Sequence, residues 1–243
     1  MAPRQKRRVT LSDLVRRRWP AWDDPTIAAT IAGGEILVEG RILTNPGAWV
    51  GADSAVRHRP APELAGRRKL AWAITRFGVA AGGRTALDVG ASTGGFTTAW
   101  LDAGAVRVYA VDAGHGQLLG SLRQDPRVVN LERTNVSDLT PAVIPVPVEV
   151  VSVDVSYLSL TAAVAQLGAV PLAGGAELLG LVKPMFELRL ATIPEDPPTL
   201  RRACAVAVAG LTDQGWEVAG ADECPVRGGK GAVEFFVHAR APG

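Results

Sequence analysis

The sequence of 243 residues has little of what metal-binding, secreted or membrane proteins depend on. It holds 2 cysteines and 3 histidines, and Cys204 and Cys224 lack the spacing of metal ligands, so we expect free thiols and no structural metal. Its apolar runs, such as residues 146–155, end well short of the roughly 18 residues that a membrane span requires. The basic N-terminus leads into no apolar segment of a secretory signal. We therefore expect a cytoplasmic protein that does not cross a membrane.

The small net charge of +2 conceals an uneven distribution along the chain. Residues 1–76 hold 14 Lys and Arg against 7 Asp and Glu, whereas residues 77–243 hold 12 against 17. A basic first third followed by a mildly acidic remainder suggests a domain that binds a polyanion, joined to a second domain with a different function. A basic tail followed by a solvated helix face is the alternative interpretation.

Residues 1–59 are predicted to form a small α+β domain behind the basic tail. Apolar residues at helical spacing predict a helix that ends at Trp19-Pro20, and Asp24 is expected to cap a second helix that stops at Gly33-Gly34. Three short strands are expected after it, at residues 36–38, 42–43 and 55–56. Residues 60–66 contain two prolines and are the expected linker to a second domain, residues 67–243.

In the second domain, short β-branched runs alternate with helical patterns. The expected strands are residues 86–89, 106–111, 128–131, 148–153, 178–182, 216–219 and 233–237. The expected helices are residues 70–79, 96–103, 160–170 and 199–211. This alternation predicts an α/β fold with a parallel sheet covered by helices on both faces. The last two strands have no helix between them, so a hairpin would make the final strand antiparallel.

The most informative single motif is the glycine-rich loop DVGASTGGFT at residues 88–97, between an apolar strand and a helix. A phosphate-binding P-loop would need Lys and then Ser or Thr after the last glycine, where this chain has Phe96-Thr97. A dinucleotide site would read G-x-G-x-x-G, and the carboxylate of Asp88 beside a pyrophosphate would be unfavourable. The same carboxylate beside the cationic methionyl part of S-adenosylmethionine is favourable. The loop therefore favours S-adenosylmethionine, with a dinucleotide as the alternative.

Further polar residues stand where other strands are expected to end. Asp112 follows the second strand, where a carboxylate can hold the ribose of either cofactor. Asn135 and Asp138 follow the third strand and are either adenine contacts or turn formers. Asp154 and Lys183 follow the fourth and fifth strands. Charges so close to a core are costly unless they are paired or used, so each is a candidate site residue or a member of a structural ion pair.

Five motifs in order resemble those of the TlyA or haemolysin A family of ribosomal RNA 2′-O-methyltransferases, whose catalytic domain is FtsJ-like: DVGASTGGFT, VDAGHGQL, DVSYLSL, LVKPMFE and GGKGAVEFF. The N-terminal module, through AGGEILVEGR and NPG, resembles the RNA-binding domain of ribosomal protein S-four. The resemblance covers nearly the whole chain. It implies a Rossmann-like class I methyltransferase sheet of seven strands with the last antiparallel, behind a small α+β RNA-binding domain.

The same resemblance implies a reaction and its partners. S-adenosyl-L-methionine would be the methyl donor, a ribose 2′-hydroxyl of ribosomal RNA, that of a cytidine, the acceptor, and ribosomal RNA or ribosomal subunits the partner. It implies no membrane and no obligate protein partner. Three readings stay open beside it: an RNA-binding protein that retains the cofactor pocket without catalysis, a methyltransferase for another RNA, and a membrane-active haemolysin. An NAD-dependent dehydrogenase is the fourth.

The resemblance also assigns roles to individual residues. The catalytic set is Lys69, Asp154, Lys183 and Glu234. The cofactor-binding set is Asp88, Gly90, Ser92, Thr93, Gly94, Gly95, Phe96, Thr97, Asp112, Ala113, Gly114, Asn135 and Asp154. The RNA-binding set is Arg4, Lys6, Arg7, Arg8, Arg16, Arg17, Arg18, Arg41, Arg67 and Arg68. A lysine acts as a base only in its neutral form, which a neighbouring cation favours; Lys69 could act in this way on Lys183. Asp154 and Glu234 would orient the two lysines and oppose that effect.

Several positions depart from the family pattern. Met185 replaces a polar residue, Ala232 replaces an asparagine, and His115 stands where an aromatic ring is usual. The N-terminal module begins with TLSDL in place of an Arg-Leu-Asp-x-Leu pattern. The catalytic set is intact, so these changes bear on the choice of substrate more than on catalysis.

Overall fold

The computed structural model describes residues 7–59 and 64–242. Contacts divide the chain into two compact units, Met1–Glu63 and Leu64–Gly243, and each is described by itself. Arg4 and Lys6, two predicted RNA contacts, lie outside the described residues, as do residues 60–63 of the predicted linker. Helix α3 begins at Ala65, so residues 65 and 66 are helical and the predicted linker was too long at this end.

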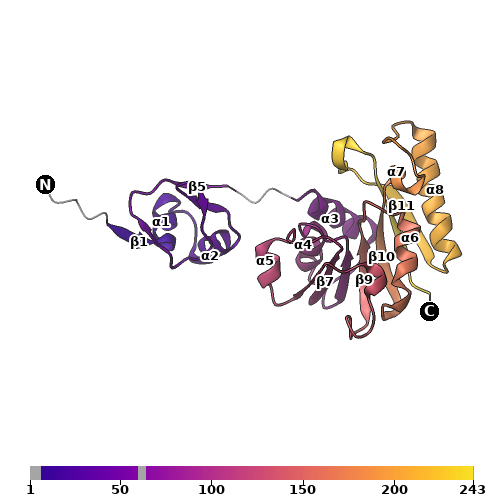
Figure 1. Cartoon of the computed structure of the whole chain (residues 1–243), viewed down its shortest axis with the longest axis horizontal. Helices are drawn as coiled ribbons and strands as arrows, with labels where there is room; N and C mark the ends of the chain where they lie inside the picture. The colour runs from indigo at the N-terminus through magenta and orange to yellow at the C-terminus, as the bar shows by residue number, and fades with distance from the viewer. Residues whose placement is uncertain (1–6, 60–63, 243) are drawn as a thin grey trace. The chain divides into compact units, whose positions relative to one another are not determined.

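The N-terminal unit packs two helices on two small antiparallel sheets (Figure 1). Its elements are β1 (Arg8–Thr10), α1 (Leu11–Arg18), α2 (Asp24–Ala32), β2 (Ile36–Val38), β3 (Arg41–Ile42), β4 (Trp49–Gly51) and β5 (Val56–His58). Strand β1 pairs with β4, and β2 lies between β3 and β5. The core is made by apolar residues of both helices and β2, among them Leu11, Ile27 and Ile36.

The predicted helices of this unit are confirmed, with one corrected cap. Helix α2 is capped by Asp23, one residue before the predicted Asp24, because the Asp23 carboxylate accepts the N–H of Thr26 at 2.9 Å. Asp24 occupies the first helical position. Strands β1 and β4 were not predicted.

The second unit contains the large sheet and its covering helices. Its elements are α3 (Ala65–Phe77), β6 (Thr85–Val89), α4 (Gly95–Asp102), β7 (Arg107–Asp112), α5 (Gly120–Gln124), β8 (Val128–Glu132), η1 (Val136–Asp138), β9 (Val148–Val153), α6 (Leu160–Val164), η2 (Ala165–Ala169), β10 (Leu172–Val182), α7 (Pro184–Glu187), α8 (Pro197–Asp213), β11 (Glu217–Glu223), η3 (Gly229–Gly231) and β12 (Phe235–Arg240). The short helices α5 and α7 were not predicted.

The seven strands of this sheet run in the order β11-β12-β10-β9-β6-β7-β8. Strands β10, β9, β6, β7 and β8 are mutually parallel, and β12 lies antiparallel between β10 and β11. The predicted α/β sheet with an antiparallel final strand is confirmed. The chain reverses its direction of travel across the sheet between β6 and β9, and ligands of such sheets bind at that switch point, at the carboxyl ends of the strands.

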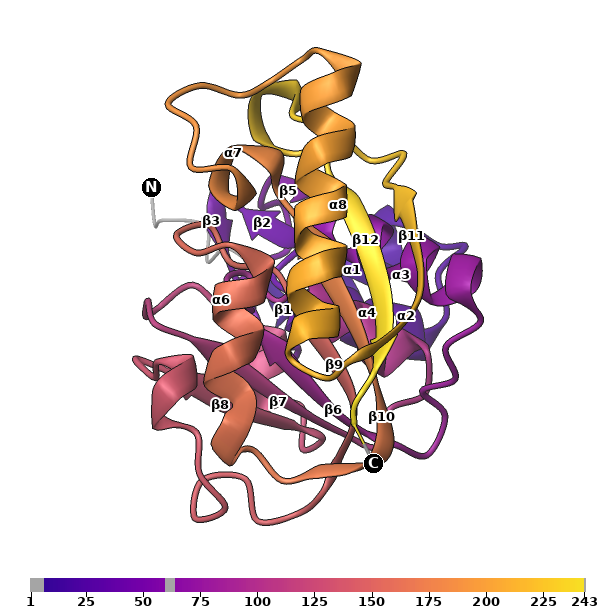
Figure 2. The same ribbon diagram turned by 90° about the vertical axis from the view of Figure 1, so that its right-hand side faces the viewer.

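Each face of the sheet has its own apolar core, because successive side chains of a strand point to opposite faces. On β6, Leu87 and Val89 belong to one core and Ala86 to the other. Helices α6 and α8 cover the first face side by side (Figure 2), and α3 packs against α4 in the second core. Within the described ranges no helix is long and apolar enough to cross a membrane.

Candidate active site

The glycine-rich loop connects β6 to α4 in a conformation that glycine permits. Gly90 has a φ of +87°, and a Cβ there would collide with the carbonyl oxygen of Asp154 at the end of β9. Gly94, with a φ of +96°, precedes the first residue of α4. The loop therefore packs directly on the neighbouring strand end, which larger residues would prevent.

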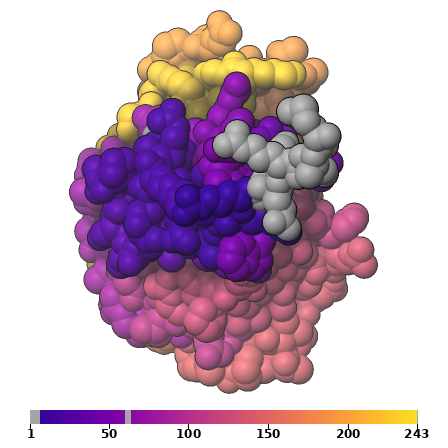
Figure 3. Space-filling view, turned by 90° about the vertical axis from the view of Figure 1, so that its left-hand side faces the viewer, coloured from indigo at the N-terminus to yellow at the C-terminus, as the bar shows by residue number. Residues whose placement is uncertain are grey.

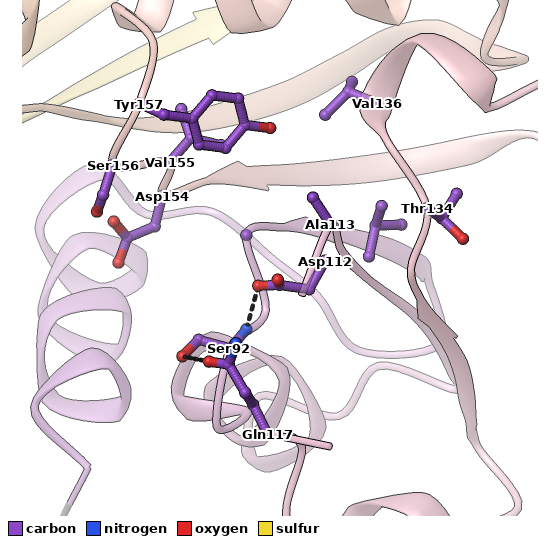
Figure 4. A pocket seen from close by; sticks show the side chains of 12 residues that line it. Ser92, Asp112, Ala113, Gln117, Thr134, Val136, Asp154, Val155, Ser156 and Tyr157 are labelled. Carbon is purple, nitrogen blue, oxygen red and sulfur yellow. Dashed lines mark hydrogen bonds between the residues drawn. The ribbon is translucent and has the colours of Figure 1, made fainter. Parts of the chain in front are cut away.

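A pocket opens at this edge of the sheet, where β6, β7 and β9 end and the chain continues beyond β8 (Figure 4). Its walls are Gly90, Ser92, Val111, Asp112, Ala113, Gln117, Thr134, Val136, Asp154, Val155, Ser156 and Tyr157. Two carboxylates belong to this lining, and none of its residues is Lys or Arg. Such a pocket suits a neutral or cationic ligand better than a pyrophosphate, which needs donors of positive charge.

Asp112 joins two loops at the floor of the pocket. Its Oδ2 accepts the N–H of Ser92 at 2.8 Å, and its Oδ1 accepts the N–H of Gly114 at 2.7 Å. The hydroxyl of Ser92 donates to Oε1 of Gln117 at 3.0 Å (Figure 4). Each carboxylate oxygen retains a second lone pair, so Asp112 can still accept hydrogen bonds from ligand hydroxyls.

The predicted cofactor residues fall into three groups. Gly90, Ser92, Asp112, Ala113 and Asp154 line the pocket. Thr93, Gly95 and Phe96 line a neighbouring hollow, together with the start of α3. The other predicted cofactor residues line neither the pocket nor the hollow. Among them, Asn135 caps the 3₁₀ helix η1 in a reciprocal arrangement with Asp138. Asn135 therefore forms a turn, and its contact with adenine stays a prediction.

Asp88 lies in the core behind the loop. It is fully buried, and its carboxylate accepts hydrogen bonds from Thr97 Oγ1 at 2.7 Å and Ser152 Oγ at 3.0 Å. Ser152 in turn accepts the indole N–H of Trp100 at 2.9 Å. Burial raises the pKa of Asp88 to about 7, and the two hydroxyl hydrogen bonds oppose this rise. Asp88 therefore joins β6, β9 and α4, and it does not contribute to the pocket wall as the motif had suggested.

The four predicted catalytic residues form two lysine–carboxylate pairs. Lys69 Nζ, on α3, lies 2.6 Å from Glu234 Oε2, and both side chains are more than nine-tenths buried. Lys183 Nζ, after β10, lies 2.5 Å from Asp154 Oδ1, and these side chains are 15% and 21% exposed. Lys69 and Glu234, 165 positions apart, are thus brought into contact because α3 packs in the same apolar core as β12.

Ser156, which was not predicted, holds the second pair from another side. The Nζ of Lys183 donates a hydrogen bond to Ser156 Oγ at 2.7 Å. The contact with Asp154 Oδ1 is an ion pair without hydrogen-bond geometry, and among the described residues that buried oxygen has no hydrogen-bond partner. The hydrogen bond is the directional contact of the two, so Ser156 orients the ammonium group while Asp154 contributes charge.

A second pocket adjoins the first and shares Ser156 with it. It is lined by Ser156, Lys183, Pro184, Met185, Phe186, Ile193, Pro194, Gly229, Ala232, Val233 and Glu234. One residue of each catalytic pair, Lys183 and Glu234, therefore belongs to this pocket. A reacting group bound there and a ligand bound in the first pocket would meet at Ser156 and the Lys183–Asp154 pair.

The predicted RNA contacts of the described residues are exposed, and some have acidic partners. Arg16 pairs with Asp13 and Asp24, and Arg67 pairs with Asp102. Arg17 and Arg18 line a groove of the N-terminal unit with Arg57, which was not predicted. Figure 3 draws the surface of this unit in indigo. The remaining residues of this set are Arg7, Arg8, Arg41 and Arg68.

Of the residues that depart from the family pattern, two line the second pocket and one does not line either. Met185 and Ala232 belong to the second pocket. His115 is exposed and stands outside the lining of the first pocket. The departures that bear on a bound ligand are thus those of the second pocket.

Comparisons with known proteins give a consistent result. A family model described as FtsJ-like methyltransferase matches residues 66–241. The chain is 37% identical to the 16S/23S rRNA (cytidine-2′-O)-methyltransferase TlyA of Mycobacterium tuberculosis, over 96% of this chain and 90% of that protein. It is 34% identical to Hemolysin A of Brachyspira hyodysenteriae, over 70% and 73% of the two chains. A solved structure of a hemolysin candidate from Streptococcus thermophilus matches 98% of this chain and 90% of its own, with a TM-score of 0.70 and 27% identity.

Proposed function

Because this chain belongs to the FtsJ-like methyltransferase family, and within it to the TlyA and haemolysin A group, we propose that it methylates a ribose 2′-hydroxyl of ribosomal RNA, that of a cytidine. S-adenosylmethionine is the methyl donor of this reaction. Two lysine–carboxylate pairs carry the proposal: Lys183–Asp154 lies at the junction of the two pockets, and Glu234 of the other pair lines the second pocket. The first pocket offers hydrogen-bond donors and acceptors for a nucleoside. The second pocket is lined by Lys183, the lysine that would act as the base.

The first pocket fits S-adenosylmethionine better than a dinucleotide. Its lining holds Asp112 and Asp154 and no basic side chain, which matches a cation and leaves a pyrophosphate without a partner. Val111 and Val136 provide apolar walls, and Asp112 can accept hydrogen bonds from ribose hydroxyls. When bound, S-adenosylmethionine supplies a methyl group on a positively charged sulfur.

Lys183 is the base in the proposed mechanism. A ribose hydroxyl is a poor nucleophile near neutral pH, so its proton must leave as the oxygen attacks. Neutral Lys183 would take the proton of the 2′-hydroxyl on its Nζ, and bound S-adenosylmethionine would supply the methyl group that the 2′-oxygen accepts and would leave as the uncharged thioether. A cation bound near Asp154 competes for its carboxylate and so favours the neutral form of Lys183.

Two other residues position this base. Asp154 and Ser156 hold Nζ of Lys183 at 2.5 and 2.7 Å. Glu234 closes the second pocket, where Lys69 fixes its carboxylate at 2.6 Å. Because transfer requires an in-line approach of oxygen, carbon and sulfur, holding the base still contributes to the rate as much as its basicity does.

The N-terminal unit, which we place at residues 1–59, is proposed to hold RNA by contacts of arginines with phosphates. Arg17, Arg18 and Arg57 surround one groove of this unit and are the residues we favour. Such contacts release counterions from the phosphates, and this release is less favourable at higher salt, so RNA affinity should fall steeply with ionic strength. The proposed substrate places the reaction in the cytoplasm, and the protein is proposed to act without an obligate protein partner.

The proposed function is tested with the purified full chain, S-adenosylmethionine labelled on its methyl group, and separated ribosomal subunits or their RNA. We expect label in ribosomal RNA and recovery of a 2′-O-methylcytidine after digestion. Label on a base atom would contradict the mechanism, and label only in another RNA would correct the substrate. Tight RNA binding without transfer to any RNA would favour a non-catalytic protein.

A further inference from the structure

Trp49 of the N-terminal unit differs from the other tryptophans of the chain in its surroundings. The chain contains 6 tryptophans, and the others are buried or packed against an apolar core: Trp19, Trp22, Trp72, Trp100 and Trp216. Trp49, on β4, is 62% exposed and belongs to none of these cores. Within the described ranges no other ring stacks on it. An indole that faces water in this way offers a large flat surface to a partner.

Trp49 shares a surface with two residues of β1. Val9 and Val50 are buried in the core of this unit, so the alternate residues of the two strands point away from that core. Thr10 lies directly opposite Trp49 in the antiparallel pair, and Arg8 is its diagonal neighbour. Diagonal neighbours on one face of a sheet are within reach of aromatic and long side chains. Arg8, Thr10 and Trp49 together form the ribbon face.

The ribbon face carries a positive charge. The guanidinium of Arg8 donates a hydrogen bond to the main-chain oxygen of Trp49 at 2.7 Å, and in the part of the chain that the structure describes it pairs with no carboxylate. Arg16, by contrast, is held by two carboxylates of α1 and α2. Residues 1–59 contain 10 Lys and Arg against 6 Asp and Glu. The charge of Arg8 therefore attracts a polyanion to the side of the exposed ring.

The backbone that carries Trp49 is held in place by the start of α1. The N–H of Leu11 donates to the carbonyl oxygen of Ala48 at 2.8 Å, and the N–H of Ser12 donates to that of Pro46 at 3.0 Å. The ring is thus presented on a preformed backbone. Because a tryptophan side chain has few rotatable bonds, little conformational entropy is lost when a flat partner stacks on it.

The occupant that fits a flat apolar ring beside a cation is an unpaired nucleotide. Its base exposes a π-face that stacks on an aromatic side chain, and its phosphate attracts the cation. In a duplex the base faces are already stacked on one another, so a duplex offers phosphates and groove edges. An apolar segment of a protein would cover the ring and leave the charge of Arg8 without a partner.

The groove of this unit lies next to the ribbon face along the chain. Arg17 and Arg18 line the groove together with Ala52. Ala52 follows Trp49 by three residues, which is about 10 Å along an extended chain. A strand of RNA whose phosphates are held in the groove therefore passes close to the exposed ring.

We infer that Trp49 stacks on an unpaired base of the bound RNA while Arg8 holds a phosphate beside it. This inference rests on the proposed function, in which the N-terminal unit holds RNA, and it adds the form of RNA that the unit selects. A domain that used phosphate contacts alone would bind helical and single-stranded RNA alike. A stacking residue favours RNA that has a nucleotide outside the helix.

The inference is tested with the purified full chain and two RNA probes, an oligouridine of about 12 nucleotides and a duplex of the same length. We expect Trp49→Ala to lower the affinity for oligouridine by roughly five- to a hundredfold, because one stacked base is lost. The affinity for the duplex should stay within about twofold of wild type, because the duplex is held by its phosphates. Fluorescence anisotropy of labelled RNA measures both affinities.

Further substitutions separate stacking from simple apolar contact. Trp49→Phe retains an aromatic ring and should keep the affinity for oligouridine within about threefold of wild type, whereas Trp49→Leu should resemble Trp49→Ala. Ile42→Ala is the matched control, since Ile42 is a 51% exposed apolar residue of β3 in the same unit. It should leave both affinities unchanged. Arg8→Gln should reduce the slope of log affinity against log salt concentration by about 0.7, the value for one phosphate of a single strand.

The outcomes separate this inference from the proposed function. Unchanged affinity of Trp49→Ala for oligouridine, or equal losses for oligouridine and duplex, would overturn the inference. Unchanged affinities for both RNAs with reduced methyl transfer to intact ribosomal subunits would assign the ring to a ribosomal protein, and this too would overturn the inference. Binding of oligouridine that depends on the Trp49 ring, in a wild-type protein that methylates no ribosomal RNA, would overturn the proposed function and leave the stacking contact standing.

Discussion

The two lysine–carboxylate pairs of the candidate site are chemically alike and differ in their surroundings. The Lys69 and Glu234 side chains are 8% and 5% exposed, while those of Lys183 and Asp154 are 15% and 21% exposed. Burying two charged groups costs hydration free energy, and their mutual attraction offsets that cost only while both partners are present. A pair at the junction of two pockets can exchange a proton with a bound hydroxyl. The difference assigns a positioning role to the first pair and the reacting role to the second.

The largest expected effect is the loss of methyl transfer in Lys183→Ala. Removing a general base costs on the order of 10²–10⁴ in rate, and Lys183→Arg should be similarly inactive because a guanidinium does not take up a proton near neutral pH. Both variants should keep the melting temperature within a few degrees of wild type, since the side chain is partly exposed. Transfer of labelled methyl groups and calorimetry measure the two effects. Residual rates above a tenth of wild type would assign the proton to another group.

Lys69→Ala is expected to act first on stability. It leaves the Glu234 carboxylate buried and unpaired, and breaking a buried pair in this way costs about 3–5 kcal/mol. Calorimetry of the full chain should show an earlier transition of the second unit with that of the N-terminal unit unchanged. The double variant Lys69→Met with Glu234→Leu should recover part of the loss. A melting temperature equal to that of wild type in Lys69→Ala would show that the Lys69–Glu234 pair contributes no more to stability than a partly exposed pair does.

Asp88 extends the comparison to a buried carboxyl group that has hydroxyl partners and no cation. Its pKa is about 7 in the folded protein, raised from 3.8 by burial. The folded state therefore holds this proton more tightly than the unfolded chain, and the associated stability, present below pH 3.8, is lost as the pH rises to about 7. Asp88→Asn should lack this component, so the stability of wild type relative to the variant should fall between pH 4 and 7.

The measurement for Asp88 is the difference in melting temperature between wild type and Asp88→Asn at several pH values. A difference that does not change across this range would mean that the folded and unfolded carboxyl groups titrate alike. Asp154→Asn, at the exposed pair, is the contrasting variant.

The smallest of these effects is expected for Ser156. Ser156→Ala removes the hydrogen bond that orients Lys183, which should lower kcat by roughly tenfold and leave KM for S-adenosylmethionine near its wild-type value. Ser156→Thr retains a hydroxyl and should recover most of the rate. The pH–rate profile of Ser156→Ala should be displaced, because the base is held differently. If Thr and Ala substitutions are equally harmful, the hydroxyl does not act through Lys183.

Many residues of this site could be predicted from sequence motifs, and the others are brought to the site only by tertiary packing. The glycine-rich loop and Asp112 stand out locally, because a turn of glycines after an apolar strand has few other uses. The membership of Lys69 and Glu234 in one catalytic set followed only from the family resemblance, and their pairing came from the structure, since 165 positions separate the two residues. Ser156 and Thr134 were missed, because a lone hydroxyl residue beside a strand end carries no pattern. The second pocket was missed too, because its walls come from three separate segments.

The sequence by itself determined the alternation of strands and helices, the antiparallel final strand and the conformation of the glycine-rich loop. These features depend on local backbone preferences and on the period of apolar residues, which are written along the chain. Only the tertiary structure decided that Asp88 faces the core while Asp154 faces a pocket, although both acids accompany apolar strands of one sheet. The physical reason is position along the strands. Asp88 lies inside β6 in register with Ser152, enclosed by β9 and α4, whereas Asp154 follows the end of β9 and lines the pocket there.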